Sequence, residues 1–389
     1  MLPKYIDLLS SSTDIIIKTF LIFYIWQATN NLAIVATFGL VYFAVIPFSS
    51  LLSGIFIDRI GTKLPHSIGI LIQISQLFFI ISYSSSNLSI STILFIAILM
   101  GIADGIKSMS LRTIMETTRD HRNEALFYAN KTISSQFVEL ILVLSGALLV
   151  GSQLGYNYLF AFTLVILTIE LIITIMLPQP STISSFDIKS ILTFPGTNID
   201  KLTLVKAIFM EGLQEGVTLT ILPIITLAFI GTIAYWGLLN TALVLLSLLF
   251  AFILSKLITD PSSHLLYGIG SIVFATTSLV FLIQYNFYVL AIFLMAQSLM
   301  GVIKNTSYFA SIDNIMAQDI NEYNLLSEYQ FLINIVSSTA RSIPLIIILL
   351  VGITIHDETS LRLILLFTGL VPLLAISFFG QSLAFKSSG

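Results

Sequence analysis

The chain has 389 residues, of which 56% are hydrophobic and only 10% are charged, and its mean hydropathy is +0.99. Soluble domains carry about 25% charged residues, so this chain has too few charges to cover a water-exposed surface, which excludes a soluble enzyme. The 17 basic and 20 acidic residues give a net charge of −3 and leave no basic footprint for nucleic acid. Because cysteine is absent, disulfides, thiolate metal sites and cysteine nucleophiles are excluded as well.

Long apolar runs predict an all-α membrane protein. A helix needs about 20 apolar residues to cross a bilayer, and twelve runs approach or exceed that length. The expected spans are 13–30, 33–57, 67–84, 90–114, 130–151, 157–177, 204–229, 232–258, 264–284, 287–312, 328–353 and 360–382. The lipid bilayer is therefore the expected surrounding of the chain.

The positions of Lys and Arg predict the orientation of these spans. Because Asp7 and Asp14 follow Lys4 and no cleavage signal follows the first run, we expect a short cytosolic lead into a retained helix. The loops expected outside, near 31, 85, 154, 231 and 285, contain no Lys or Arg, and only Arg362 departs from this pattern. We therefore predict a multi-pass protein of the cell membrane with both termini in the cytosol. The bases on the expected inner side are Lys4, Arg59, Lys63, Arg119, Arg122, Lys189, Lys201, Lys256 and Lys386.

The segment 178–203 predicts a division into two halves. It is polar and contains helix breakers such as Pro178, Pro180 and Pro195, and it lies near the middle of the chain. We interpret it as a cytosolic linker between two six-helix bundles, 1–177 and 204–389.

Short matches between the halves predict an internal repeat. Ile106 and Lys107 recur as Ile303 and Lys304, 197 positions later, at similar depths of the fourth and tenth spans. His66 and His264 open the third span of each half, and the sequence LVG ends spans five and eleven at 149–151 and 350–352. The offsets of 197, 198 and 201 positions agree closely, which favours a duplicated bundle.

The segment after the second span, 54–63, reads GIFIDRIGTK. A glycine at Gly54 permits a neighbouring helix to approach, Asp58 at a helix end suits a cation or a helix N-terminus, and Gly61 permits a tight turn. Arg59 and Lys63 follow the positive-inside rule. An ordinary positively charged loop is the alternative interpretation.

The segment 54–63 resembles the cytosolic G-x-x-x-D-[RK]-x-G-[RK]-[RK] motif of the major facilitator superfamily. Thr62 departs from the motif, and the second half has Lys256 where the aspartate would stand. The resemblance implies two pseudo-symmetric six-helix bundles and transport by alternating access. In span four, Gly101–Gly105 reads GIADG and lacks the arginine of the family's R-x-x-Q-G, and span five lacks the Gly-Pro-rich motif of drug exporters. Both departures disfavour drug efflux.

Eight ionisable residues are expected deep in spans, where each costs about 2.5–3.5 kcal/mol on insertion scales. The five acids outnumber the three bases, so some acids must be protonated, bind water or face a cationic ligand. This favours proton coupling, with Asp104, Glu139, Glu211 and Glu215 as candidate carriers. The eight residues are Asp104, Lys107, Glu139, Glu170, Glu211, Glu215, Lys304 and Arg341.

The resemblance implies that spans one, four, seven and ten line a central cavity. It places Asp104, Lys107, Glu211, Glu215, Lys304 and Asn305 there, with the amides of Gln27, Asn30 and Asn31 from span one. Ion pairs among Glu211, Glu215, Lys304 and Arg341 are expected to link spans seven, ten and eleven. Two alternatives remain open: such charges only hold helices together, or Lys107 and Lys304 extend toward the cytosol. Glu170 is expected to have a structural role.

The cytosolic loops of the two halves differ in charge. Four bases and three acids lie in 112–131, whereas one base and four acids lie in 304–328. We hypothesise that Asp58, Arg112 and Arg122 meet Asp319, Glu322 or Glu328 across the gap between the halves. Solvated loop charge is the alternative.

The predicted function is secondary active transport of a small organic solute, coupled to protons. Efflux of amphipathic or drug-like compounds is the alternative. The four histidines lie at loops or span ends without metal-ligand spacing, so no catalysis, metal or cofactor is expected. We expect a monomer.

Overall fold

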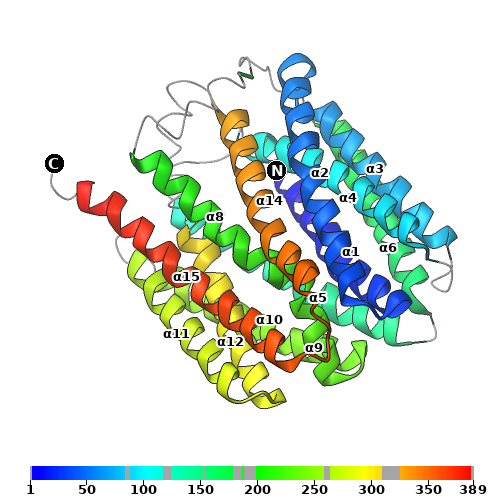
Figure 1. The fold of residues 1–389 in the computed structure, drawn as a ribbon. Coiled ribbons are helices and arrows are strands. Elements are labelled where there is room, and N and C mark those ends of the chain that lie inside the picture. The colour runs from blue at the N-terminus through cyan, green and yellow to red at the C-terminus, as the bar shows by residue number, and fades with distance from the viewer. Residues whose placement is uncertain are drawn as a thin grey trace.

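The computed structural model describes residues 2–83, 88–116, 124–152, 154–177, 186–187, 199–257, 263–308 and 325–386. All secondary-structure elements in these ranges are helices, and they form one elongated bundle (Figure 1). The first half contains α1 (Leu2–Thr29), α2 (Leu32–Ile60), α3 (Lys63–Ser82), α4 (Ile90–Glu116), α5 (Glu124–Gly151) and α6 (Gly155–Met176).

The second half repeats this pattern with two interruptions. It contains α8 (Ile199–Thr220), α9 (Leu222–Ile230), α10 (Ile233–Leu257), α11 (Ser263–Ile283), α12 (Phe287–Ile303), the π-helical turn η4 (Lys304–Tyr308), α14 (Leu326–Val351) and α15 (Glu358–Lys386). Pro223 in the first turn of α9 has no backbone N–H to continue the ladder from α8. The seventh span is therefore broken at Ile221.

In the described part of the chain, twelve helices are long and apolar enough to cross a membrane, which agrees with the predicted number and confirms the all-α class. The first helix begins earlier than the expected span 13–30, because α1 begins at Leu2 and carries both Asp7 and Asp14 inside the helix. Their charges are paired: Lys131 Nζ lies 2.9 Å from Asp7 Oδ1, and Lys18 Nζ lies 2.9 Å from Asp14 Oδ2. These ion pairs lower the free-energy cost of including the two charged residues in α1. A hydropathy pattern takes no account of such pairs.

Small residues permit close packing inside each half. A Cβ atom on Gly101 of α4 would lie 2.7 Å from the carbonyl oxygen of Tyr42 on α2. On α8, a Cβ on Gly212 would lie 2.7 Å from Ala340 Cβ and one on Gly216 would lie 2.8 Å from Pro344 Cγ, both on α14. The helix pairs α2–α4 and α8–α14 are thus held at distances that only glycine allows.

The two halves meet along α2 with α14 and along α5 with α10, and α2 and α14 run side by side in Figure 1. We call the end of the bundle where α2 ends and α14 begins the linker end, because α6 also ends there and α8 starts there. At the linker end, Asn334 Nδ2 of α14 donates to Ser50 Oγ of α2 at 2.8 Å and to Ser108 Oγ of α4 at 3.1 Å.

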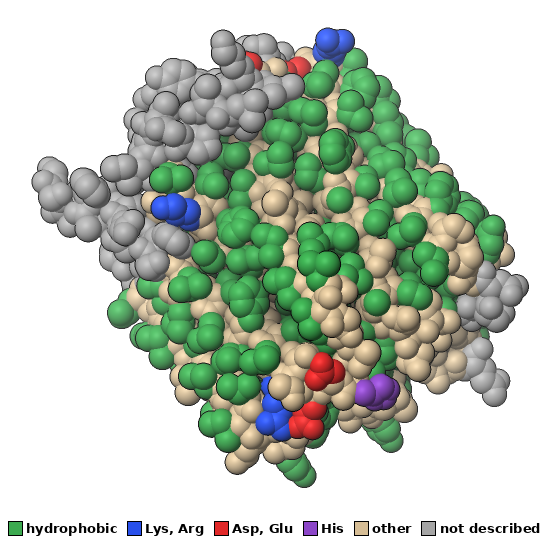
Figure 2. All heavy atoms as spheres, in the orientation of Figure 1, with side chains coloured by type: hydrophobic (Ala, Val, Ile, Leu, Met, Phe, Trp, Pro, Cys, Tyr) green, Lys and Arg blue, Asp and Glu red, His purple; other side chains and the backbone are tan. Residues whose placement is uncertain are grey.

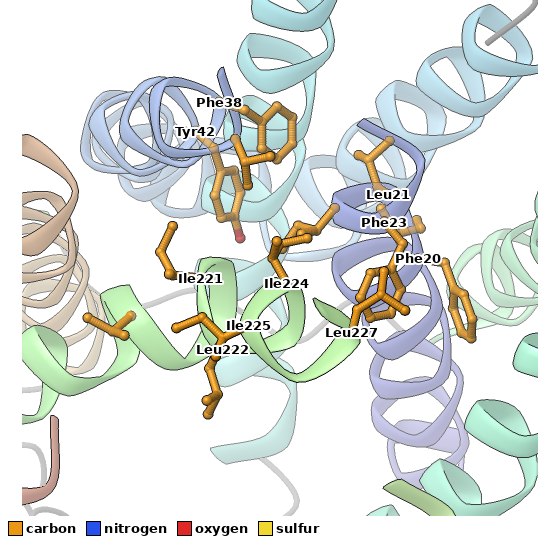
Figure 3. Packing of buried hydrophobic residues seen from close by; sticks show 14 of the residues in the cluster. Phe20, Leu21, Phe23, Phe38, Tyr42, Ile221, Leu222, Ile224, Ile225 and Leu227 are labelled. Atoms are coloured by element: carbon orange, nitrogen blue, oxygen red, sulfur yellow. The ribbon is translucent and has the colours of Figure 1, made fainter. Parts of the chain in front are cut away.

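At the opposite end the halves meet through aromatic and aliphatic side chains. Trp236 of α10 lies edge-on to Phe23 of α1, with ring centroids 4.6 Å apart. Figure 3 shows Ile224 and Leu227 of α9 extending from the second half toward Phe23 of α1. The halves are therefore in contact at both ends of the bundle.

The outer surface is apolar over most of the face in Figure 2, with charged side chains near its edges. Large hydrophobic residues are exposed there and elsewhere, among them Leu350 at 82% and Phe48 at 71% exposure. Such a surface suits lipid rather than water.

Candidate functional site

The C-terminal cluster comprises Glu211 and Glu215 of α8, Lys304 of η4 and Arg341 of α14. Lys304 Nζ lies 2.7 Å from Glu215 Oε1 and also forms an ion pair with Glu211. Arg341 Nε donates to Glu215 Oε2 at 2.9 Å. The structure thus brings together the four residues whose pairing the sequence predicted. Two acids and two bases make the cluster electrically balanced.

Arg341 also connects this cluster to the other half. Its guanidinium carbon lies 5.5 Å from the ring centroid of Phe43 on α2, a cation–π contact across the interface between the halves. Phe43 in turn packs against Tyr42, with ring centroids 4.8 Å apart. Because Tyr42 belongs to a second group of polar residues, Arg341 stands between two charged clusters.

The N-terminal cluster fills the interior of the first half. Lys18 Nζ of α1 lies 2.9 Å from Asp14 Oδ2 and 3.0 Å from Asp104 Oδ2, and the Tyr42 hydroxyl donates to Asp104. Gln73 Nε2 donates to Asp104 Oδ1 at 3.3 Å. The cluster comprises Asp14, Lys18, Tyr42, His66, Gln73, Asp104, Lys107 and Glu170.

Lys107 links Asp104 to the far side of the N-terminal cluster. Its Nζ donates to Gln73 Oε1 at 2.7 Å and lies 3.3 Å from Glu170 Oε1 and 3.9 Å from Asp14 Oδ1. Only 3% of its side chain is exposed. Lys107 therefore does not extend toward solvent, and Lys304, paired with Glu211 and Glu215, does not either.

Residues of the two clusters are related by one sequence offset. Asp14 and Glu211, Lys18 and Glu215, and Lys107 and Lys304 are each 197 positions apart. In both halves the lysine of the fourth span reaches the earlier residue of the matched pair in the first span: Lys107 pairs with Asp14, and Lys304 pairs with Glu211. The matched residues Lys18 and Glu215 have opposite charges. Lys18 bridges two acids, whereas Glu215 bridges two bases.

Asp14, Lys18, Tyr42, His66 and Gln73 were not among the site residues predicted from the sequence. Asp14 and Lys18 both lie near the start of the expected first span, 13–30. The offset of 197 positions, applied backward from Glu211 and Glu215, leads to both residues. Tyr42, His66 and Gln73 lack such a signal, because each owes its place to the packing of α2 and α3 against α4.

A cavity of about 240 Å³ lies between the halves, where α8 breaks into α9. Among the described residues that line this cavity, Glu139 of α5 is the charged one. Gln136 Oε1 and Gln297 Oε1 are buried and accept no hydrogen bond from a described residue. Further lining comes from Thr218, Pro223, Thr226, Trp236, Asn240 and Ser298.

The remaining predicted site residues lie elsewhere. Gln27 and Asn30 are exposed at the end of α1, opposite the linker end and apart from both clusters. Asn31 begins α2 as an N-cap that accepts from the Ala33 amide at 2.9 Å. Asn305 follows Lys304 in η4 and is half-buried.

The 54–63 motif lies at the linker end. Gly61 closes α2 with φ of 82°, and its amide donates to Ile57 O at 2.9 Å, as a tight turn requires. The expected helix neighbour of Gly54 is wrong: a Cβ there would lie 2.8 Å from the ring of Phe186 in the segment between the halves. Arg59 is exposed, and Lys63 Nζ donates to Leu177 O at 3.3 Å.

Three residues of the charge contacts hypothesised across the gap form hydrogen bonds with described partners. Asp58 accepts a hydrogen bond from the Phe186 amide, Glu328 Oε1 accepts one from the Asp187 amide at 2.9 Å, and Arg112 Nη1 donates to Tyr128 OH at 3.1 Å. Arg122, Asp319 and Glu322 lie outside the described residues.

Solved structures have the same arrangement of helices. A bacterial homologue of the iron transporter ferroportin, in an outward-facing state, has a TM-score of 0.72 and 13% identity, over 98% of this chain and 99% of that one. The proton:xylose symporter XylE of the major facilitator superfamily has a TM-score of 0.69 and 11% identity, over 97% and 95%. The chain has the major facilitator fold.

A third structure with the major facilitator fold is the human organic anion transporter MFSD10, with a TM-score of 0.60 and 13% identity over 96% of this chain and 97% of that one. No protein-family profile and no curated protein sequence matches the chain. At these identities the comparisons establish the fold and leave substrate and coupling to the residues themselves.

Proposed function

We propose that the chain is a secondary active transporter that moves a small polar organic solute across a membrane by alternating access. The observation that carries the proposal is the cavity between the halves, at the break of the seventh span, in a protein whose two halves each contain a cluster of ion pairs. In folds of this kind, discontinuous helices at the repeat interface form substrate sites, and the halves rock about them.

The cavity favours a solute that donates hydrogen bonds and carries positive or no net charge. Glu139 supplies the negative charge, and the free carbonyl oxygens of Gln136 and Gln297 supply acceptors. Ligand pockets usually measure about 300–1,000 Å³, so a volume of about 240 Å³ suits a small molecule. The three similar structures carry names that refer to iron, xylose and organic anions, so the fold itself does not decide among substrates.

Proton coupling is part of the proposal, with Asp104, Glu139, Glu211 and Glu215 as candidate carriers. The proposed topology places the linker end and both termini on the cytosolic side of a cell membrane. The reason is that Lys and Arg concentrate in the loops that the sequence predicts on that side. We further propose that the protein acts as a monomer, without cofactor or metal.

A thermal-shift screen of organic cations, zwitterions, sugars and amphipathic drugs on the purified protein tests the substrate class. A small polar cation that raises the melting temperature of the native protein but not of Glu139→Gln supports the cavity as its site. Stabilisation by amphipathic drugs alone supports the efflux alternative.

Flux tests the transport step itself. The stabilising compound is loaded into proteoliposomes and its counterflow is measured, first without and then with a proton gradient. Glu139→Gln is expected to weaken uptake, whereas Glu358→Gln, at an exposed position far from the cavity, serves as the matched control. Absence of counterflow in the native protein contradicts the proposed function.

A further inference from the structure

His66 and Glu170 form a contact that the central cavity does not use. His66 Nε2 of α3 lies 3.3 Å from Glu170 Oε1 of α6, and both side chains are fully buried at 0% exposure. Lys107 Nζ lies 3.3 Å from the same carboxyl oxygen. Burying an imidazole and a carboxyl group this close together, away from water, costs free energy unless a proton is placed so that the two groups attract each other.

The hydroxyl group of Ser110 on α4 bears on which ring nitrogen of His66 carries a hydrogen. Ser110 Oγ lies 2.9 Å from Ile106 O and 3.1 Å from Lys107 O, and these carbonyl oxygens can only accept. We take the single hydroxyl hydrogen of Ser110 to be directed to one of these carbonyl oxygens, which leaves Ser110 Oγ to accept. His66 Nδ1 lies 3.0 Å from Ser110 Oγ, and in this arrangement Nδ1 carries the hydrogen.

This assignment decides what lies between His66 and Glu170. With a hydrogen on Nδ1, neutral imidazole presents a bare lone pair at Nε2 to Glu170 Oε1. Two lone pairs at 3.3 Å repel each other, so one more proton must lie in the pair. The pair is then either imidazolium with carboxylate or imidazole with carboxylic acid.

The charge count leads independently to the same proton. Among the described residues of the N-terminal cluster, Asp14, Asp104 and Glu170 face two lysines, Lys18 and Lys107. With all five ionised the cluster has a charge of −1, and one added proton makes it neutral. The C-terminal cluster is balanced without such a proton, because two acids meet two bases.

A chain of contacts joins the pair to the interface between the halves. From Glu170 it runs through Lys107 and Gln73 to Asp104, by contacts of 3.3, 2.7 and 3.3 Å, and Asp104 accepts from Tyr42. Any change of charge at Glu170 therefore alters the pairing of Lys107 and, through Gln73, the surroundings of Asp104.

We propose that His66 and Glu170 together form a binding site for one exchangeable proton in the N-terminal half. The charged groups facing His66 are Glu170 from α6, Lys107 from α4 and Asp14 from α1. His66 lies one helical turn from the start of α3, at the linker end. The role of this proton in transport rests on the proposed function, whereas its presence does not.

Spectroscopy of the unmodified protein tests the site. Nitrogen NMR with isotope-labelled histidine is expected to show either an imidazolium or an Nδ1–H imidazole for His66, with His66→Gln and the exposed His356→Gln used for assignment. In the Nδ1–H case, infrared spectroscopy must show a carboxylic acid band that Glu170→Gln removes. An Nε2–H neutral imidazole beside an ionised Glu170 overturns the proposal.

Transport measurements separate the coupling role from the site. In Glu170→Gln, we expect counterflow of solute to persist while accumulation driven by a proton gradient is lost, because the pair no longer exchanges its proton. If Glu170→Gln still accumulates solute in response to a proton gradient, the pair has no role in coupling. If native protein shows counterflow but no response to the gradient, proton coupling in the proposed function fails while the spectroscopic result on the site still stands.

Discussion

Asp58 and Glu328, on α2 and α14 of opposite halves, accept hydrogen bonds from two consecutive backbone amides, those of Phe186 and Asp187. The segment between the halves thus joins them at the linker end. The Phe186 ring packs edge-on against Phe331 of α14, with centroids 6.1 Å apart, and against the surface left open by Gly54. Opening the linker end requires these contacts to break.

Asp58→Asn is expected to open the linker end more often. A hydrogen bond to a charged group contributes about 1.5–3 kcal/mol, and each 1.4 kcal/mol changes a population about tenfold. Since the chain has no native cysteine, Met109→Cys, buried in the hydrophobic cluster beside Phe331, provides a single labelling site. We expect thiol labelling to accelerate roughly tenfold in the Asp58→Asn background.

Phe186→Ala should accelerate labelling of Met109→Cys in the same direction. Phe48→Ala, which removes an exposed phenylalanine of α2, is the matched control and should leave the rate unchanged. Equal rates in all these backgrounds contradict a role of the segment in closing this end.

Gly54→Ala is expected to destabilise the linker end by displacing Phe186. The new Cβ would lie 2.8 Å from the Phe186 ring, which is closer than van der Waals contact permits. Because the cause is this ring, the effect on labelling of Met109→Cys should vanish when Phe186→Ala is also present. Gly268→Ala in α11 has no neighbouring atom within 4 Å and should be neutral or stabilising. Additive effects of Gly54→Ala and Phe186→Ala argue against the contact.

Arg341→Gln is expected to destabilise the protein by about 2–3 kcal/mol. Removing one partner of a buried ion pair costs about 3–5 kcal/mol, and the side chains of Arg341 and Glu215 retain 22% and 21% exposure, which reduces the penalty. Adding Glu215→Gln should restore part of the loss, because the uncompensated carboxylate is then removed. Thermal unfolding of the single and double variants in detergent measures both changes; a double variant no more stable than Arg341→Gln contradicts the pairing.

Gly39→Leu is expected to separate the halves at the end opposite the linker. A Cβ on Gly39 of α2 would lie 2.8 Å from Thr220 Cγ2 of α8 and 2.9 Å from Leu345 Cδ1 of α14. Overpacking costs about 1–3 kcal/mol, so labelling of the buried Ile225→Cys should accelerate roughly tenfold. Ala44→Leu on the exposed face of α2 should leave it unchanged. No acceleration in Gly39→Leu means that this contact does not limit opening.

The predicted charge pairs were partly accessible from the sequence. Glu211 and Glu215 are four residues apart, so they share a helix face, and their meeting with Lys304 and Arg341 followed from the resemblance to the superfamily. Asp14 was missed because it stands at the very start of the expected span 13–30, next to the lead that Lys4 and Asp7 indicate. Its ion pairs are with Lys18 of the same helix and with Lys107 of α4, which lies far along the chain.

The sequence by itself determined the twelve spans, their all-α class and the repeat, because apolar length is a property of each segment alone and a bilayer accepts only segments whose backbone is internally satisfied. Only the tertiary structure decided which charges meet. The Glu170 carboxyl, expected to be structural, meets His66 and Lys107 because α3, α4 and α6 pack together. Contacts between side chains depend on the distances between helices, and these are set by the packing of the whole bundle.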